Sequence, residues 1–226
     1  MGFLSTILDI VFPANCLACG VSGTDLCITC LSNVPPAERE SAKWIFPCFD
    51  YRHPPIKKAV WLIKYKGKKR LVGVLAEILH GKILEELSEL SLMQNFRQPL
   101  LIPIPLSAQR YRERGFNQAE LLCRELVNLS PSPSPDRRGA GGEVFTLVTN
   151  VLIKPKETRH QAHIENRAER LKNIAGSYAV KNAELIKGRN IILIDDVTTT
   201  GATLAEARKI LKQSGAKKII AFTIAH

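Results

Sequence analysis

Near the C-terminal end of the sequence lies the stretch Asn190-Ile191-Ile192-Leu193-Ile194-Asp195-Asp196-Val197-Thr198-Thr199-Thr200-Gly201-Ala202-Thr203. Its run of four aliphatic residues before two acids is typical of a strand buried in a parallel sheet. Apolar residues then recur at helical spacing up to Leu211, and Gly215 stands where a glycine is favoured after a helix. The stretch therefore predicts a strand, a polar loop and a helix.

The composition of this loop suits a phosphorylated sugar. A loop that opens a helix presents unpaired N–H groups and partial positive charge to an anion. Gly201 and Ala202 let the backbone come close, and the hydroxyls of Thr198, Thr199, Thr200 and Thr203 can donate to phosphate oxygens. The carboxylates of Asp195 and Asp196 can instead hold sugar hydroxyls or a hydrated Mg²⁺. The alternative is an ordinary strand–helix turn with an Asp/Thr cap.

Taken as a whole, the string resembles the phosphoribosyl-pyrophosphate (PRPP) loop of type I phosphoribosyltransferases. In that family two acids follow an aliphatic strand and precede a Thr-Thr-Gly-x-Thr segment. The resemblance implies that the acids bind the ribose hydroxyls and that the threonine-rich loop binds the 5′-phosphate. The string lacks the GxxxxGK[ST] pattern of a Walker A loop.

Composition limits the class of protein. The 226 residues suffice for one ordinary domain with a small appendage, and 45% hydrophobic and 23% charged residues are typical of a soluble globular chain. The net charge of +11 favours polyanionic partners, either nucleic acid or phosphorylated metabolites, although it also fits a generally basic surface. No apolar run is long enough to span a membrane, and no signal peptide is expected.

Four cysteines near the N-terminus form two CxxC pairs, Cys16 with Cys19 and Cys27 with Cys30, separated by seven residues. Two such pairs place four thiolates on two tight turns, which suits tetrahedral Zn²⁺. Since four cysteines leave no open coordination position, the zinc is expected to be structural. A disulfide cluster is the alternative, disfavoured by the absence of a secretory signal.

Two further segments carry clustered positive charge. Lysines surround an aromatic residue in Lys64-Tyr65-Lys66-Gly67, and Lys64 and Lys66 are therefore candidate contacts to phosphate or to single-stranded nucleic acid. Arg110 and Arg114 lie in Arg110-Tyr111-Arg112-Glu113-Arg114-Gly115-Phe116-Asn117-Gln118, after a predicted buried strand over Pro99–Pro105. We expect a mobile loop here that clamps a pyrophosphate at the strand's end. The alternatives are a solvated helix end and an exposed basic turn.

Taken together, the motifs look like those of the ComF family, the amidophosphoribosyltransferase-like bacterial competence proteins. Their order is the four-cysteine module, Lys-Tyr-Lys-Gly, Pro-x-Pro, Arg-x-x-x-Arg-Gly-Phe-Asn-Gln-Ala, a Gln…Arg-x-x-Asn helix and the Asp-Asp-Val-x-Thr-Thr-Gly loop. The resemblance covers about residues 8–226. It implies an α/β fold like that of type I phosphoribosyltransferases: a mainly parallel sheet flanked by helices, with a small N-terminal zinc-binding module.

The resemblance also implies a domain division and a set of roles. Residues 1–43 would form the zinc module and linker, and residues 44–226 the phosphoribosyltransferase-like domain. The stretch at 130–143 departs from the family: it is rich in Pro, Ser, Gly and Arg, lacks an apolar pattern and is expected to be a flexible insertion. Asp195 and Asp196 would be the catalytic acids, with structural Zn²⁺ and Mg²⁺ as cofactors. PRPP, or another phosphorylated ribose, would contact residues of three segments: Thr198, Thr199, Thr200, Gly201, Ala202, Thr203, Arg110, Arg114, Lys64 and Lys66.

Two functions follow as hypotheses. One is a cytoplasmic protein that binds PRPP and takes part in DNA uptake during natural transformation. This hypothesis leaves open whether the protein is also a phosphoribosyltransferase. Its partners would include single-stranded DNA and the competence helicase machinery. The other is a non-catalytic phosphate sensor or single-stranded-DNA-binding protein that uses the same fold. The sequence contains no pattern that names an acceptor.

Overall fold

The computed structural model describes residues 14–37, 42–130, 145–155 and 173–226, and within this set the side chains of 92–94 are not described. The predicted insertion at 130–143 therefore lies almost wholly outside the described residues, as does most of the helix expected to carry the Gln…Arg-x-x-Asn motif.

The centre of the molecule is a five-stranded sheet with strand order β1-β7-β6-β2-β3, in which every described pairing is parallel. Its strands have the following bounds: β1 Ile45–Phe49, β2 Leu100–Pro103, β3 Thr146–Leu147, β6 Asn190–Val197 and β7 Lys218–Ala225. A separate two-stranded antiparallel unit pairs β4, Leu152–Ile153, with β5, Ala179–Val180. This arrangement confirms the predicted α/β class with a mainly parallel sheet.

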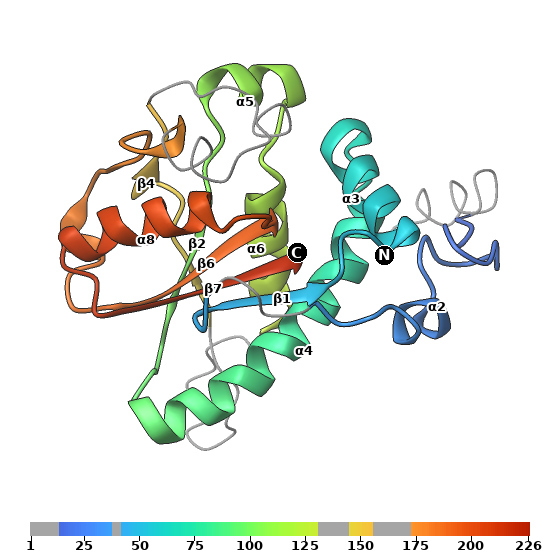
Figure 1. Ribbon diagram of the computed structural model, residues 1–226, viewed down its shortest axis with the longest axis horizontal. Coiled ribbons are helices and arrows are strands. Elements are labelled where there is room, and N and C mark those ends of the chain that lie inside the picture. Colours follow the sequence, from blue (N-terminus) through green and yellow to red (C-terminus); the bar gives the residue numbers. More distant parts are fainter. Residues whose placement is uncertain (1–13, 38–41, 131–144, 156–172) are drawn as a thin grey trace.

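Helices cover both faces of the sheet (Figure 1). Three helices, α3 Pro54–Lys66, α4 Lys69–Gln94 and α6 Gln118–Leu129, contribute to the core on one face. Helix α8, Ala202–Gln213, packs on the other face together with β4 and β5. The short elements α2 Ile28–Ser32, α5 Ala108–Arg114 and the 3₁₀ helix η2 Ala183–Leu185 complete the described set.

The aliphatic run of β6 explains why this strand is central. Ile192 and Ile194 belong to the core on the α4 and α6 face, whereas Ile191 and Leu193 belong to the core on the α8 face. All four side chains are fully buried. Because successive side chains on a strand point to opposite faces, a continuous aliphatic run fits a strand that is covered on both sides.

The predicted strand, loop and helix are confirmed: β6 ends at Val197 and α8 begins at Ala202. Gly215 has a φ of +95°, in the left-handed region, just beyond the end of α8. The strand expected over Pro99–Pro105 is also present, as β2.

The expectation of a mobile loop at Arg110–Gln118 is wrong in its secondary structure. Residues Ala108–Arg114 form helix α5, which ends at Gly115 with a φ of +76°. The segment Ala108–Arg114 contains no glycine or proline, and alanine, glutamine, arginine and glutamate all favour helix. Two arginines four residues apart therefore lie on one face of a helix.

The N-terminal cysteine segment packs onto the main body. Cys16, Leu26 and Leu31 are buried in the same core cluster as residues of α3 and α4. At its edge, Lys68 Nζ lies 3.3 Å from Oδ1 of the buried Asp25. The boundary at residues 43 and 44 remains a prediction, although the two segments share apolar contacts.

Candidate functional site

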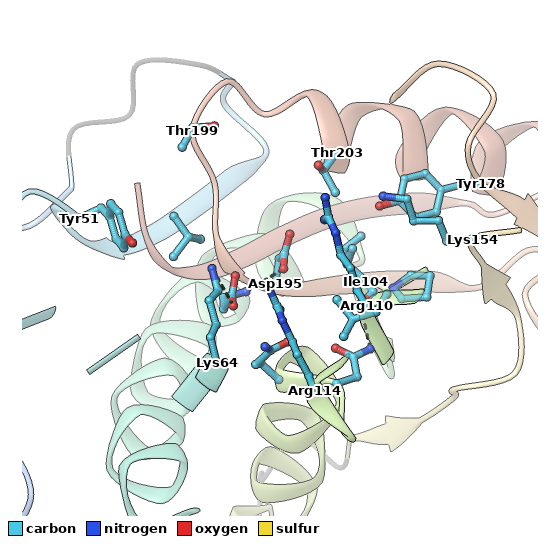
Figure 2. Close-up of a pocket in the computed structure, with 16 residues that line it drawn as sticks. Tyr51, Lys64, Ile104, Arg110, Arg114, Lys154, Tyr178, Asp195, Thr199 and Thr203 are labelled. Atoms are coloured by element: carbon cyan, nitrogen blue, oxygen red, sulfur yellow. Dashed lines mark hydrogen bonds and ion pairs between the residues drawn. The ribbon is translucent and has the colours of Figure 1, made fainter. Parts of the chain in front are cut away.

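The acid pair, Asp195 and Asp196, lies at the C-terminal end of β6, the central strand of the sheet, which pairs with β2 on one side and with β7 on the other. In open parallel sheets, this edge is where ligands bind. The backbone N–H of Asp196 donates to Asp195 Oδ1 at 2.9 Å, which fixes the orientation of the Asp195 carboxylate. Both acids line a cavity, and Figure 2 shows Asp195 among its labelled residues.

This cavity has a volume of about 260 Å³ and collects side chains from most of the elements at this edge. Helix α3 contributes Lys64, α5 contributes Arg110 and Arg114, and the start of α6 contributes Gln118. The turn after β2 supplies three apolar residues of the lining, Ile104, Pro105 and Leu106. The sequence-predicted acids, two arginines and one lysine thus converge on one cavity.

Charges of both signs face each other in this cavity. Lys64 Nζ lies 3.1 Å from Asp196 Oδ2, and both side chains are mostly buried. Burial opposes the charge on Lys64, but the carboxylate of Asp196 outweighs it and raises the Lys64 pKa. For Asp195, burial first and the neighbouring Asp196 charge second raise the pKa to about 7.

Two residues of the cavity carried no signal in the sequence. Lys154, just after β4, and Tyr178, just before β5, both line it, and Lys154 Nζ lies 5.3 Å from the centre of the Tyr178 ring. Both side chains are more than nine-tenths buried. Burial raises the pKa of the Tyr178 hydroxyl well above its ordinary value. No sequence motif surrounds either residue. They are recognised as cavity residues only from the position of the antiparallel unit of β4 and β5 in the structure.

The threonine-rich loop contributes selectively to the lining. Thr199 and Thr203 line the cavity, whereas Thr198 is buried and its N–H donates to the Ala225 carbonyl at 2.9 Å. The hydroxyl of Thr200 accepts from the N–H of Ala202 at 3.4 Å. Gly201, with a φ of +71°, is the residue before the first turn of α8.

Gly201 and the buried Ala202 therefore shape the loop without lining the cavity themselves. The N-terminus of α8 lies beside the cavity, because the loop that leads into it contributes Thr199 and the helix itself contributes Thr203.

The lysines of the lysine-rich segment have different surroundings. Lys64 is paired with Asp196 inside the cavity, and Lys68 is paired with Asp25 of the cysteine segment. Lys66 is exposed on the last turn of α3 and is not among the residues that line the cavity. Next to it, Tyr65 is exposed and its ring lies 5.5 Å from the guanidinium carbon of Arg114.

The four N-terminal cysteines form a candidate metal centre. Their Sγ atoms all lie within 4.8 Å of one another, and Cys19 Sγ is 3.7 Å from Cys27 Sγ. The Cys27 N–H donates to Cys16 Sγ at 3.4 Å, as is common around thiolate ligands. Four convergent sulfurs can hold a metal such as zinc. Cys48 lies outside this cluster, and burial raises the pKa of its thiol to about 12.

Among the residues that the structure describes, no helix combines the length and the apolar character needed to cross a membrane.

Comparison with known protein families gives a match to the phosphoribosyl transferase domain over residues 142–226. This region contains β6, the threonine-rich loop and α8, so the acid pair lies inside it. Among solved structures, a hypoxanthine phosphoribosyltransferase from Staphylococcus aureus is 11% identical, with a TM-score of 0.34 over 67% of this chain and 62% of that one. Phosphoribosylpyrophosphate synthetase from Mycobacterium smegmatis is 20% identical, with a TM-score of 0.31 over 66% of this chain and 33% of that one.

The names of similar proteins refer to DNA utilization or to competence. The DNA utilization protein YhgH of Salmonella typhimurium is 27% identical over 193 residues, which cover 85% of this chain and 74% of the relative. Competence protein ComFC of Streptococcus pneumoniae is 32% identical over 58% of this chain and 50% of its own length. Competence protein F of Haemophilus influenzae is 35% identical over 53% of this chain and 46% of its own length.

Proposed function

Because the chain is a ComF-family protein with a type I phosphoribosyltransferase-like domain, we propose that its cavity binds PRPP, or another phosphorylated ribose, together with Mg²⁺. One observation supports this most strongly. Two adjacent carboxylates and four basic side chains, those of Lys64, Arg110, Arg114 and Lys154, line a single cavity beside the N-terminus of α8. A sugar with hydroxyls in its middle and phosphates at its ends matches this distribution of charge.

Each part of the ligand has a candidate partner. Thr199, Thr203 and the first turn of α8 would hold the 5′-phosphate through hydroxyls and the helix dipole. The carboxylates of Asp195 and Asp196 would accept hydrogen bonds from the ribose hydroxyls. Arg110 and Arg114 would contact the pyrophosphate, since guanidinium groups bind phosphate oxygens in pairs.

The donor set also fits Mg²⁺. This cation takes oxygen ligands, keeps several of its waters and is commonly held by one or two carboxylates together with substrate phosphates. Asp195 and Asp196 are neighbouring carboxylates on the cavity wall and would hold it. When bound, Mg²⁺ would neutralise negative charge on the pyrophosphate.

The same arrangement is able to support transfer of the phosphoribosyl group. In that reaction a nucleophile bonds to ribose C1 as the C1–O bond to pyrophosphate breaks and the pyrophosphate departs with the bonding electrons. The chain's contribution would be to position the two ends of the ligand and to stabilise the leaving pyrophosphate with Arg110 and Arg114. The residues of the cavity identify no acceptor, so the proposed function is the binding of the phosphorylated ribose.

Calorimetric titration of the full chain with PRPP in the presence of Mg²⁺ tests this proposal. We expect saturable binding that Asp195→Asn together with Asp196→Asn weakens by at least about tenfold, because hydrogen bonds to charged groups are worth that much. Glu89→Gln is the control, since Glu89 is an exposed acid on α4. If the unaltered chain does not bind PRPP, the proposal is wrong.

The names of the relatives suggest the biological context. We propose that the protein acts in DNA uptake during competence, on the cytoplasmic side of the membrane, where incoming single strands and their helicase machinery meet.

A specific surface supports a second candidate function, the binding of single-stranded DNA. Trp61 and Tyr65 are about half exposed on α3, with ring centres 5.6 Å apart. Lys57 and Lys58 are exposed one turn before them.

Exposed rings beside cations suit stacked bases and a phosphate backbone. Binding of a single-stranded oligonucleotide should weaken as salt rises, and Lys57→Ala with Lys58→Ala should flatten that dependence. Lys181→Ala with Lys187→Ala, an equal loss of charge at exposed positions outside α3, should leave the slope unchanged. Equal slopes for all three proteins would exclude this surface.

A further inference from the structure

Two residues, Gly67 and Lys68, form the junction between α3 and α4, and this junction contacts two other parts of the chain. Gly67 has a φ of +58°, in the left-handed region, and a Cβ on it would lie 3.3 Å from the Phe116 ring. Lys68 Nζ lies 3.3 Å from Asp25 Oδ1. The junction therefore contacts both the cysteine segment and the turn that leads from α5 into α6.

Asp25 belongs to the framework of the four-cysteine cluster. It lies two residues before Cys27, and its carbonyl accepts from the N–H of Leu17, the residue after Cys16, at 2.9 Å. This bond joins the segments that carry the two CxxC pairs. The Asp25 side chain is 4% exposed, and its Oδ2 has no hydrogen-bond partner among the described residues. Lys68 thus compensates the charge of a buried acid whose backbone belongs to the metal centre.

The last turn of α3 contacts the charged groups of the cavity. Lys64 Nζ lies 3.1 Å from Asp196 Oδ2, and the Tyr65 ring lies 5.5 Å from the guanidinium carbon of Arg114. Lys64 and Arg114 both line the cavity, and Figure 2 shows both beside Asp195. The same short segment of chain thus contacts the acid pair, α5 and, through the junction, the cysteine segment.

These contacts link the two ends of the segment mechanically. Because a helix is a rigid element, a displacement of the junction moves the side chains of the last turn of α3 together. The space beside Gly67 is too small for a methyl group without a shift of the Phe116 ring, so the junction and the turn before α6 are in close contact. Release of Lys68 from Asp25 would therefore affect both the acid pair and α5.

We propose that the metal centre positions the charged side chains of the cavity through the contact between Lys68 and Asp25, so that Lys68 is a positioning residue for the ligand site. With metal bound, Asp25 holds the junction, and α3 keeps Lys64 on Asp196. Without metal, the two CxxC segments lose their common anchor, and α3 and α5 open more often. Metal occupancy and the order of the cavity are then coupled, and the coupling is reciprocal. This inference does not depend on which ligand the cavity binds.

Hydrogen–deuterium exchange of the full chain, measured by mass spectrometry, tests the coupling. Peptides from α3 and α5 report the proposed path, and peptides from α8, on the other face of the sheet, report general loosening. Each protein is measured after loading with zinc and again after a chelator has removed it, and elemental analysis gives the zinc content. Lys68→Met removes the charge, and Lys68→Arg keeps it. Lys69→Met is the control, because Lys69 is the adjacent exposed lysine.

In the unaltered chain, removal of zinc should accelerate exchange in α3 and α5 by at least about fivefold more than in α8. Lys68→Met should keep its zinc but already show this difference between the helices when loaded, and the chelator should then add less than about twofold to it, because both changes break the same contact. Lys68→Arg and Lys69→Met should behave like the unaltered chain.

The proposal is refuted if the chain takes up no zinc, if zinc removal loosens α8 as much as α3 and α5, if folded Lys68→Met loses its zinc, or if that variant responds like the unaltered chain. Titration with PRPP and Mg²⁺ separates this inference from the proposed function. Together they predict that zinc-loaded Lys68→Met binds PRPP about fivefold more weakly, and equal affinity would refute the positioning role. If PRPP binds neither protein while the exchange result holds, the proposed function is wrong and the coupling stands.

Discussion

Asp195 and Asp196 follow one another in the chain, but their surroundings differ. Asp196 is paired with Lys64 at 3.1 Å, whereas Asp195 is held by the Asp196 backbone and faces the cavity. Burial and the neighbouring acid raise the Asp195 pKa from 3.8 to about 7. An acid with a raised pKa is stabilised in its protonated form by the folded protein.

The raised pKa predicts that the ionised Asp195 carboxylate destabilises the folded chain, by an amount that depends on pH. Between pH 3.8 and about 7 the folded chain binds more protons at this site than the unfolded chain, so stability falls as pH rises through that window. Asp195→Asn removes the ionisation and should be more stable than the unaltered chain by up to roughly 4 kcal/mol at pH 8, since each unit of raised pKa is worth about 1.4 kcal/mol. The gain should vanish near pH 4. Melting curves in metal-free buffer from pH 4 to 8 check this, and a gain that does not depend on pH would contradict it.

Lys64 offers a second prediction at this scale. Because its ammonium compensates a mostly buried carboxylate, Lys64→Ala should destabilise the chain by about 2 kcal/mol at pH 8. Lys66→Ala, two residues away and exposed, should change stability by less than about 0.5 kcal/mol. Urea unfolding measures both. Equal effects of the two substitutions would mean that the ion pair has no net stabilising role.

At the scale of elements, the turn from β6 into α8 depends on one backbone conformation. Gly201 precedes the first residue of α8 with a φ of +71°, a conformation that costs other residues about 1 kcal/mol or more. Gly201→Ala should lower stability by that amount. It should also weaken binding of ribose 5-phosphate, since Gly201 lies between Thr199 of the loop and Thr203 of the first turn of α8.

The matched control is Gly73→Ala. Gly73 lies inside α4, and a Cβ there would meet nothing within 4 Å. This substitution should stabilise the chain by up to about 1 kcal/mol through helix propensity and leave ligand affinity unchanged. Calorimetric titration and thermal unfolding of both variants separate a local effect on the loop from a general effect on the fold. A Gly201→Ala variant with normal affinity would mean that the loop conformation is unimportant for binding.

Elements with a strong local pattern could be predicted from the sequence. The four consecutive aliphatic residues of β6 predict a strand that is buried on both faces. The helical spacing of apolar residues after Ala202 predicts a helix that is buried on one face, and the structure contains both elements. Helix α5 was missed because its charged residues, with no apolar face buried, resemble a loop; none of its residues is buried. Lys154 and Tyr178 reach the cavity only through tertiary placement of β4 and β5, which no local pattern reports.

At the scale of the whole molecule, the cysteine segment packs into the main hydrophobic core and does not form a separate domain. Cys16, Leu26 and Leu31 pack in the cluster that also contains α3 and α4. The CxxC spacing predicted the four-cysteine cluster, but it could not predict this docking, because sequence spacing says nothing about which distant surface a small module covers. Lys68 and Asp25 join the two parts at 3.3 Å.

The shared core predicts that metal loss affects the whole chain. We expect one zinc per chain by elemental analysis, and Cys16→Ser with Cys19→Ser should lower both zinc content and the melting temperature of the single main transition. Cys123→Ala is the control for loss of a cysteine: Cys123 is buried on α6 outside the cluster, so this variant should lose stability but keep its zinc. Metal-free protein with an unchanged melting temperature would contradict the role of the metal.

The central claim is that the acid pair and the threonine-rich loop together hold a ribose phosphate at the end of β6. A crystal structure of the full chain with PRPP and Mg²⁺ measures this most directly. We predict ribose hydroxyls within hydrogen-bond distance of the Asp195 and Asp196 carboxylates, and the 5′-phosphate against Thr199, Thr203 and the first turn of α8. A 5′-phosphate bound elsewhere, with the two acids still paired only to protein groups, would contradict the account.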